Sequence, residues 1–175
     1  MPIEPMASVL RDSDRVGLRY HRSLHHPPDK VWRALTESEH LRHWLPCDIV
    51  GERRAGADVE LPFWPDHIET FGIDEPVLTG QILVWEPTSM FEWTWAGDVL
   101  RFELAPRGDG TDLTFTTWFA DPDVAAGAGG GYHVCLDHLI HLLDGAGDLP
   151  FTDARVQAEA DRWQQRYSDL LASTS

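Results

Sequence analysis

One predicted helix, residues 131–143, carries side chains that could bind a metal ion or transfer a proton: His133, Asp137, His138 and His141. His133, Asp137 and His141 recur every four residues, which places them on one face of a helix, a spacing that can present ligands to zinc. The opposite face carries an apolar stripe: Tyr132, Leu136, Leu139 and Leu143. Since the stripe must face the core, we interpret the polar face as solvated and expect no metal.

Cysteine offers a second chemistry. Cys135 lies in the same helix and could pair with a histidine, but a thiol is a nucleophile only with a lowered pKa and open access. Cys47 is distant in the sequence and forms no CxxC motif. The N-terminal residues show no basic region followed by an apolar stretch, so we expect no signal peptide and two free thiols in a reducing cytoplasm. No catalytic constellation emerges, and we expect no cofactor.

The glycine-rich run 125–131, AAGAGGG, precedes this helix and suggests a phosphate-binding helix N-terminus. It lacks the Lys-Ser/Thr of a P-loop and follows an antiparallel strand. We therefore predict a flexible joint.

The elements that must position these residues follow from periodicity. Residues 16–24 alternate as a strand, and two short helices follow at 29–37 and 38–45. Residues 64–76 form a long connection whose Asp66, His67 and Glu69 could reach the mouth of a cavity. The remaining predicted strands succeed one another through short turns, which predicts an antiparallel meander. They contain residues 59–63, 77–85, 90–95, 99–106 and 112–119.

We predict a flexible lead-in at residues 1–14, one domain at 15–145 and an appended C-terminal helix within 146–175. The stripe of that last helix spans fewer than three heptads, so docking onto its own domain is favoured over a dimer seam.

Composition excludes several partners. The formal net charge of −15 disfavours nucleic acid and anionic membrane surfaces, which require a basic face. No apolar run reaches the roughly 20 residues of a membrane span. We expect a soluble cytoplasmic protein.

Several short motifs follow one another in a fixed order along the chain. P-x-x-V-W-x-A-L and L-x-x-W are formed by Pro28, Val31, Trp32, Ala34, Leu35, Leu41 and Trp44. A glycine turn and a G-Y-x-x-x-L-x-x-L helix motif follow at Gly108, Gly110, Thr111, Gly131, Tyr132, Leu136 and Leu139. These motifs and their order resemble the START-like (SRPBCC) superfamily, and most closely the homologues of the activator of the Hsp90 chaperone's ATPase, in which a tryptophan is usual at the position of Tyr132.

This resemblance implies an α+β helix-grip fold, in which a curved antiparallel sheet wraps a long helix around a cavity. Aromatic and apolar residues on the facing segments are the expected cavity lining: Trp44, Phe63, Trp64, Trp93, Trp95, Phe102, Phe115, Tyr132, Leu136 and Leu139. Three functions stay open: a non-catalytic carrier or sensor of a small hydrophobic or aromatic molecule, a protein-binding module of the chaperone-activator kind, and a cyclase or hydrolase using the same cavity. The first is favoured, because few polar residues are predicted to point inward.

Overall fold

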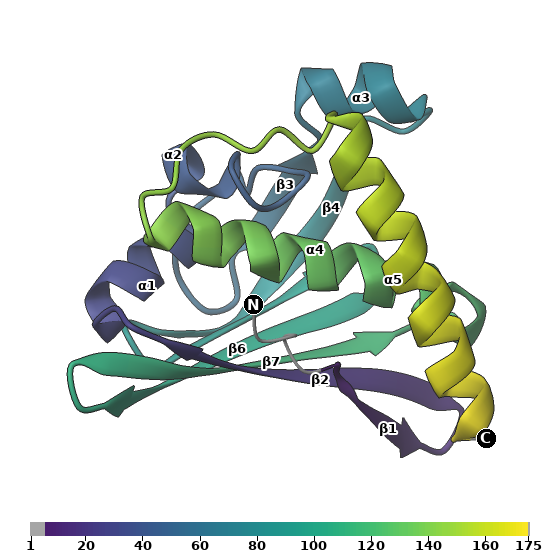
Figure 1. Cartoon of the computed structure of the whole chain (residues 1–175). Coiled ribbons are helices and arrows are strands. Elements are labelled where there is room, and N and C mark those ends of the chain that lie inside the picture. The colour runs from purple at the N-terminus through teal and green to yellow at the C-terminus, as the bar shows by residue number, and fades with distance from the viewer. Residues whose placement is uncertain (1–5, 175) are drawn as a thin grey trace.

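In the part of the chain that the structure describes, seven antiparallel strands form one curved sheet in the order β1-β2-β7-β6-β5-β4-β3 (Figure 1). The computed structural model describes residues 6–174. The strands are β1 (Ser8–Asp12), β2 (Arg15–Leu24), β3 (Asp58–Pro62), β4 (Val77–Glu86), β5 (Met90–Trp95), β6 (Asp98–Arg107) and β7 (Gly110–Phe119). β4 to β7 follow one another as the meander that the alternation predicts.

Five α-helices of the described residues accompany the sheet, with α4 lying across one face of it and α5 crossing α4 (Figure 1). They are α1 (Pro28–Thr36), α2 (Ser38–Leu41), α3 (Pro65–Phe71), α4 (Ala125–Leu143) and α5 (Ala154–Ser173), and a 3-10 turn at Pro122–Val124 precedes α4. This is the predicted α+β helix-grip fold. Of the helices between residues 6 and 174, none combines the length and apolar character that a bilayer span requires.

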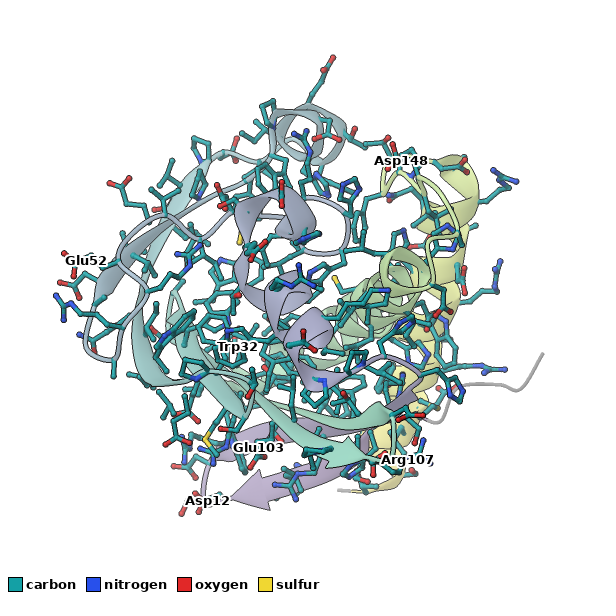
Figure 2. The ribbon with its side chains drawn as sticks, turned by 90° about the vertical axis from the view of Figure 1, so that its left-hand side faces the viewer. Asp12, Trp32, Glu52, Glu103, Arg107 and Asp148 are labelled. Carbon is teal, nitrogen blue, oxygen red and sulfur yellow. The ribbon has the colours of Figure 1, made fainter. Side chains whose placement is uncertain are left out.

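Strand register builds the core from a transverse row of aromatic rings. Phe91 pairs with Phe102, Phe102 with Phe115, and Phe115 with Tyr20 across β5, β6, β7 and β2. Phe102 and Phe115 stack with ring centroids 4.5 Å apart, and all four rings are buried. Trp32 of α1, which Figure 2 labels, extends the row beyond Phe91. The centroids of these two rings lie 6.1 Å apart. Aromatic rings that pack against one another thus fill the centre of the sheet–helix interface.

The apolar stripe of α4 meets this row as predicted. Tyr132, Leu136, Leu139 and Leu143 are buried. The glycine run differs from the prediction, because it is not a joint but the first part of α4 itself. A Cβ on Gly129 would lie 2.7 Å from Leu18, and one on Gly130 would lie 2.6 Å from the backbone nitrogen of Gln164. These glycines are there because α4 packs too closely on β2 and α5 for any side chain.

That close packing overturns the predicted solvent face of α4. His133 and His138 are buried, not hydrated, because the C-terminal segment covers them. His133 stacks on Trp163 of α5 with centroids 3.5 Å apart, and His138 stacks on Phe151 at 4.2 Å. Helix α5 therefore docks onto its own chain, along the histidine-bearing face of α4.

The N-terminal segment also differs from a lead-in. Residues 1–5 lie outside the described residues, but Ser8–Asp12 form β1, which pairs with β2. The buried backbone N–H of Ala7 donates to the Tyr167 hydroxyl of α5 at 3.0 Å. Pairing with β2 and the contact with Tyr167 provide hydrogen-bond partners for backbone N–H and C=O groups that a free segment would expose to water.

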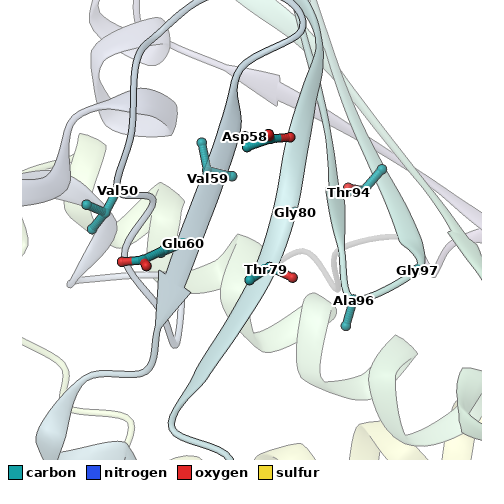
Figure 3. A pocket seen from close by; sticks show the side chains of 9 residues that line it. All are labelled: Val50, Asp58, Val59, Glu60, Thr79, Gly80, Thr94, Ala96 and Gly97. Atoms are coloured by element: carbon teal, nitrogen blue, oxygen red, sulfur yellow. The ribbon is translucent and has the colours of Figure 1, made fainter.

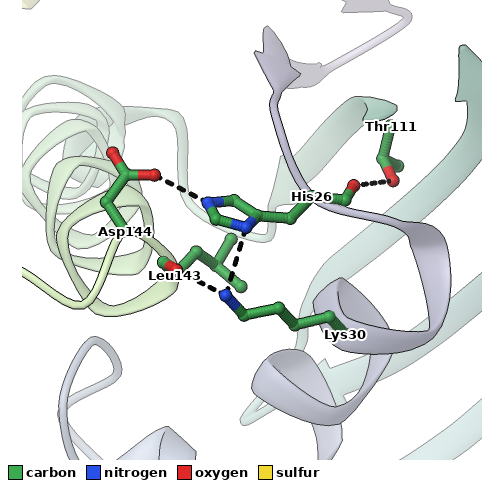
Figure 4. Close-up of polar contacts among 5 residues, drawn as sticks. All are labelled: His26, Lys30, Thr111, Leu143 and Asp144. Atoms are coloured by element: carbon green, nitrogen blue, oxygen red, sulfur yellow. Dashed lines mark hydrogen bonds and ion pairs between the residues drawn. The ribbon is translucent and has the colours of Figure 1, made fainter. Parts of the chain in front are cut away.

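The C-terminus of α4 is tied to the β2–α1 junction by a polar cluster (Figure 4). Lys30 Nζ donates to the carbonyl of Leu143 at 2.7 Å and lies 3.1 Å from His26 Nδ1. His26 Nε2 lies 2.6 Å from the Asp144 carboxylate, and Thr111 donates to the His26 carbonyl. A cation at the last carbonyls of a helix complements its dipole, so this cluster fixes the end of α4.

Two helical boundaries were wrong in the sequence prediction. α2 ends at Leu41 rather than continuing to residue 45, and the expected connection 64–76 contains α3. Pro65 occupies the first turn of α3 and Gly72 ends it at a left-handed φ of 60°. Both residues are ordinary helix boundary signals.

Candidate ligand-binding cleft

An open, mainly apolar cleft of about 320 Å³ lies between α3, the N-terminal half of α4 and the start of α5. It is lined by Pro46, His67, Phe71, Trp95, Ala128, Gly131, Tyr132, Val134, Cys135, Phe151, Val156, Gln157 and Ala160. The cleft therefore lies beside the N-terminal half of α4, and none of the residues of the aromatic row lines it.

Each wall of the cleft comes from a different element. Trp95 is the last residue of β5, directly before the Ala96–Gly97 turn, where both residues have positive φ. The α3 helix supplies His67 and Phe71, and α4 supplies Tyr132 and Cys135. The wall from the C-terminal segment consists of Phe151, Val156, Gln157 and Ala160. The cleft is complete only when α3 and α5 are both docked.

Gly131 borders the open space of the cleft. It is exposed, and a Cβ at this position would meet no atom within 4 Å. This distinguishes it from Gly129 and Gly130, which are required by close packing. A large side chain at position 131 would therefore project into free space beside Tyr132.

Two nitrogen atoms of the cleft-lining residues are buried without a hydrogen-bond partner, namely Trp95 Nε1 and His67 Nε2. The other ring nitrogen of His67 faces Asp66 Oδ1 at 3.4 Å. The His67 side chain is 4% exposed and packs between Phe71 and Phe151. Unpartnered buried polar atoms are rare in folded proteins. Both atoms lie behind the surface of the cleft, out of contact with solvent, so the accessible surface of the cleft stays mainly apolar.

The remaining titratable groups of the cleft are neutral at physiological pH. Burial raises the pKa of the Cys135 thiol to about 12. Burial also raises the pKa of the Tyr132 phenol well above its usual value, and the nearby Asp98 carboxylate adds to this shift. A protonated thiol is a poor nucleophile, so the arrangement is suited to binding rather than to covalent chemistry.

The structure distributes the predicted lining residues between cleft and core. Trp95 and Tyr132 line the cleft, and Phe63 packs against Trp95 at 5.9 Å. Trp64 is half-buried, and its indole N–H donates to the carbonyl of Leu45. The others lie in the packed core: Trp44, Trp93, Phe102, Phe115, Leu136 and Leu139. They pack in the centre of the sheet–helix interface, whereas the cleft lies beside Ala128–Cys135 of α4.

Of the three polar residues expected at a cavity mouth, His67 is a buried lining residue of the cleft, whereas Asp66 and Glu69 do not line it. The contributions of Phe71, Phe151 and Val156 were missed. Pro65 and Gly72 are helix boundary signals that could have predicted α3. The apolar stripe of α5 contains Val156. Neither pattern predicts where its helix docks.

Two further concavities differ in character. One of about 620 Å³ lies over β3, β4 and the β5–β6 turn and includes the side chains of Asp58, Glu60, Thr79 and Thr94 (Figure 3). The other, of about 680 Å³, runs along α4 and α5 past both buried histidines and several surface charges. The first has no aromatic residue in its lining, and the second adds the charged residues Asp137, Glu159 and Arg162 to its apolar and aromatic wall.

Metal binding by α4 gains no support. Within residues 6–174, the group that brings three possible ligand atoms within 4.8 Å of one another is Glu37, Glu39 and His40 near α2. The histidines of α4 are instead engaged with Tyr167, Trp163, Phe151 and the Val134 carbonyl.

This sheet, gripped helix and end cleft define a protein of the START-like class. The model of the family described as activator of Hsp90 ATPase homolog 1-like protein matches residues 25–144, and the chain belongs to that family. No curated protein sequence matches the chain.

Solved structures share the fold. A conserved protein of unknown function from Enterococcus faecalis is 17% identical, with 97% of this chain and 92% of that chain covered and a TM-score of 0.77. CalU16 from Micromonospora echinospora is 18% identical over 95% of this chain and 97% of its own, with a TM-score of 0.69. A protein from Mesorhizobium loti is 26% identical, covering 75% and 98%, with a TM-score of 0.61. The first two cover nearly the whole chain, so α5 is part of the shared fold.

Proposed function

We propose that this protein binds a small, planar, largely apolar molecule in the cleft between α3, α4 and α5, as a carrier or sensor that does no chemistry on it. The observation that carries the proposal is the lining itself, in which aromatic rings from four separate segments surround one open space. They are Phe71, Trp95, Tyr132 and Phe151.

The dimensions support a small ligand. The cleft holds about 320 Å³, near the lower end of the roughly 300–1,000 Å³ typical of small-molecule sites. Aromatic walls offer flat apolar area that favours stacking on a planar partner. We therefore expect a molecule of one to three fused rings rather than a long acyl chain.

Binding is favoured over catalysis because neither the thiol nor the imidazole of the cleft is activated for chemistry. The Cys135 thiol stays protonated far above neutral pH, and His67 has no nucleophile among its hydrogen-bond partners. A cyclase or hydrolase would need a titratable side chain that acts on the bound molecule. His67 is the one histidine among the cleft-lining residues, so acid–base catalysis by histidine in the cleft would depend on it alone.

Family membership favours a second candidate, a module that binds a chaperone and stimulates its ATPase. The net charge of −15 would suit a basic protein surface. Stimulation of a purified Hsp90 ATPase by the purified protein would support this role, and the absence of both stimulation and association would remove it.

The cleft proposal is tested with naphthalene as the probe, by equilibrium dialysis that measures free and bound probe. We expect Gly131→Ala to bind naphthalene as the wild type does, because one methyl group leaves most of the space open. Gly131→Trp should reduce binding at least tenfold, because the indole would occupy the cleft. Equal binding by the wild type and Gly131→Trp, or no binding by either Gly131→Ala or the wild type, would overturn the proposal.

A further inference from the structure

Every aromatic ring of the C-terminal segment, residues 144–174, packs on a buried imidazole. The segment contains three aromatic residues, and between residues 6 and 174 three histidines are buried. The ring pairs are Phe151 with His138 and His67, Trp163 with His133, and Tyr167 with His133. Since this segment forms a wall of the cleft, each aromatic anchor of that wall rests on an imidazole.

The surroundings of His138 suit a neutral ring. Its Nδ1 lies 2.8 Å from the carbonyl oxygen of Val134, which can only accept, so Nδ1 carries the proton. Its Nε2 is buried and has no hydrogen-bond partner among the described residues. An imidazolium would carry a second N–H at this Nε2, and a buried donor without an acceptor is costly.

His133 is placed in a similar way. Its Nδ1 shares a hydrogen bond with the Tyr167 hydroxyl at 3.0 Å, and its Nε2 is buried without a partner in the described part of the chain. Two cations act on this ring, Arg22 of β2 and Arg166 of α5. A charged His133 would therefore be repelled from both elements that pack against this face of α4.

The concavity along α4 and α5 carries charges of both signs beside these rings. Its titratable groups other than the two buried imidazoles are Asp137, His141, Asp144, Glu159, Arg162 and Arg166. Burial is the main cause that lowers the pKa of His133 to about 3. Burial also lowers the pKa of His138, although two backbone carbonyls and the Glu159 carboxylate favour the charged form. An imidazole that reaches water takes up its proton at about pH 6.5.

We propose that the C-terminal segment is an acid-released wall of the cleft, which undocks from α4 when His133 and His138 become protonated, while the sheet stays folded. Both imidazoles hold the wall only in the neutral form, so their contribution is complete above about pH 6.5 and is lost as the pH falls toward 3. The apolar stripe on the other face of α4 keeps this helix on the sheet. Loss of a bound molecule on release rests on the proposed function, whereas the release itself does not.

Hydrogen exchange of the ligand-free protein, followed by mass spectrometry at pH 7.5 and 4.5, tests the release. The protection factors of the α5 amides, which correct for intrinsic exchange, should fall at least about hundredfold, because His133 alone gains that factor when it is protonated in the released segment. At pH 4.5 these amides should be at least about tenfold less protected than the amides of β7.

Variants assign the effect to the imidazole. His133→Phe keeps a ring on Trp163 and should make the fall in α5 protection at least about tenfold smaller. His25→Gln removes an exposed imidazole and should leave the fall unchanged. The change between the two pH values is the readout, so a constant loss of stability in a variant does not alter the comparison. If His133→Phe does not fold, His133→Gln also removes the titrating ring.

The outcomes separate the release from the function. Equal protection of α5 and β7 at pH 4.5, or a fall that His133→Phe retains in full, would overturn the acid release. Naphthalene at ten times its dissociation constant should raise α5 protection about tenfold, because it binds only when the wall is docked. Naphthalene binding that leaves α5 protection unchanged would overturn the coupling between wall and ligand. Absence of naphthalene binding at pH 7.5 would overturn the proposed function, while exchange of the ligand-free protein still decides the release.

Discussion

The imidazole of His133 on α4 stacks on the indole of Trp163 on α5 with ring centroids 3.5 Å apart. Nδ1 of the same imidazole lies 3.0 Å from the Tyr167 hydroxyl, which also accepts from the backbone of Ala7. One buried histidine therefore joins α4, α5 and, through Tyr167, the segment leading into β1. The segment that ends in α5 also forms a wall of the cleft, so the same contact helps to hold that wall in place.

The burial of His133 predicts an acid-sensitive fold. Burial lowers its pKa to about 3, with Arg22 and Arg166 adding to the shift. The unfolded chain binds this proton near pH 6.5 and the folded chain does not, so the stabilising contribution is complete above about pH 6.5 and is lost as the pH falls toward 3. We expect the free energy of unfolding to drop by about 1–3 kcal/mol through this residue between pH 7 and 4.

Urea unfolding at several pH values measures this effect. His133→Phe keeps a ring on Trp163 and should flatten the dependence over that range, whereas His25→Gln, at an exposed position, should not. An unchanged slope in His133→Phe would mean that other groups cause the acid loss.

Tyr167→Phe should loosen the N-terminal strand together with α5. The substitution leaves the buried Ala7 N–H without its acceptor, and an unsatisfied buried group costs about 1–3 kcal/mol. Hydrogen exchange should accelerate at Ala7 and along β1. Ser173→Ala removes an exposed hydroxyl of the same helix and should change neither quantity. Unaltered exchange at Ala7 in Tyr167→Phe would show that the hydroxyl is dispensable there.

Neighbouring glycines of α4 should respond to alanine in opposite directions. Gly130→Ala forces a Cβ against the backbone of α5 and should cost about 1–3 kcal/mol net. Gly131→Ala meets nothing and should gain up to about 1 kcal/mol from helix propensity. Chemical denaturation of both variants decides the point, and a similar change in both would contradict the packing role given to Gly130.

Lys30, the one lysine of the sequence, should contribute through the end of α4. Lys30→Met keeps the aliphatic stem but removes the donor to the Leu143 carbonyl, with an expected loss of about 1 kcal/mol. Arg33→Met is the control, because Arg33 is an exposed cation on the same helix. Thermal unfolding should separate the two variants, and equal melting temperatures would argue against the cluster in Figure 4 as a clamp.

Local periodicity was enough to predict the elements that face the core. Alternation at Phe91 and Trp93 and the stripe through Leu136 and Leu139 identify buried faces, because each pattern depends only on strand or helix geometry. The order of the family-like motifs along the chain predicted the fold. These signals need no knowledge of how distant segments dock.

The histidine face of α4 shows where such reasoning stops. His133 and His138 are polar and lie opposite the stripe, so periodicity assigns them to water, yet α5 covers them. Only the bare backbone at Gly129 and Gly130 lets α5 come so close, and a glycine run alone equally suggests a loop. The cleft lies elsewhere than the predicted cavity for the same reason, since its position depends on where α3 and α5 dock.

The most direct test of the cleft follows the indole N–H signals in a ¹⁵N–¹H correlation spectrum during titration with naphthalene. The Trp95 signal, assigned from Trp95→Phe, should shift progressively because the probe stacks beside its ring, while the Trp118 signal stays in place. The Trp95 shift should vanish in Gly131→Trp. A stationary Trp95 signal at saturating probe, or a shift that Gly131→Trp retains, would contradict ligand binding in this cleft.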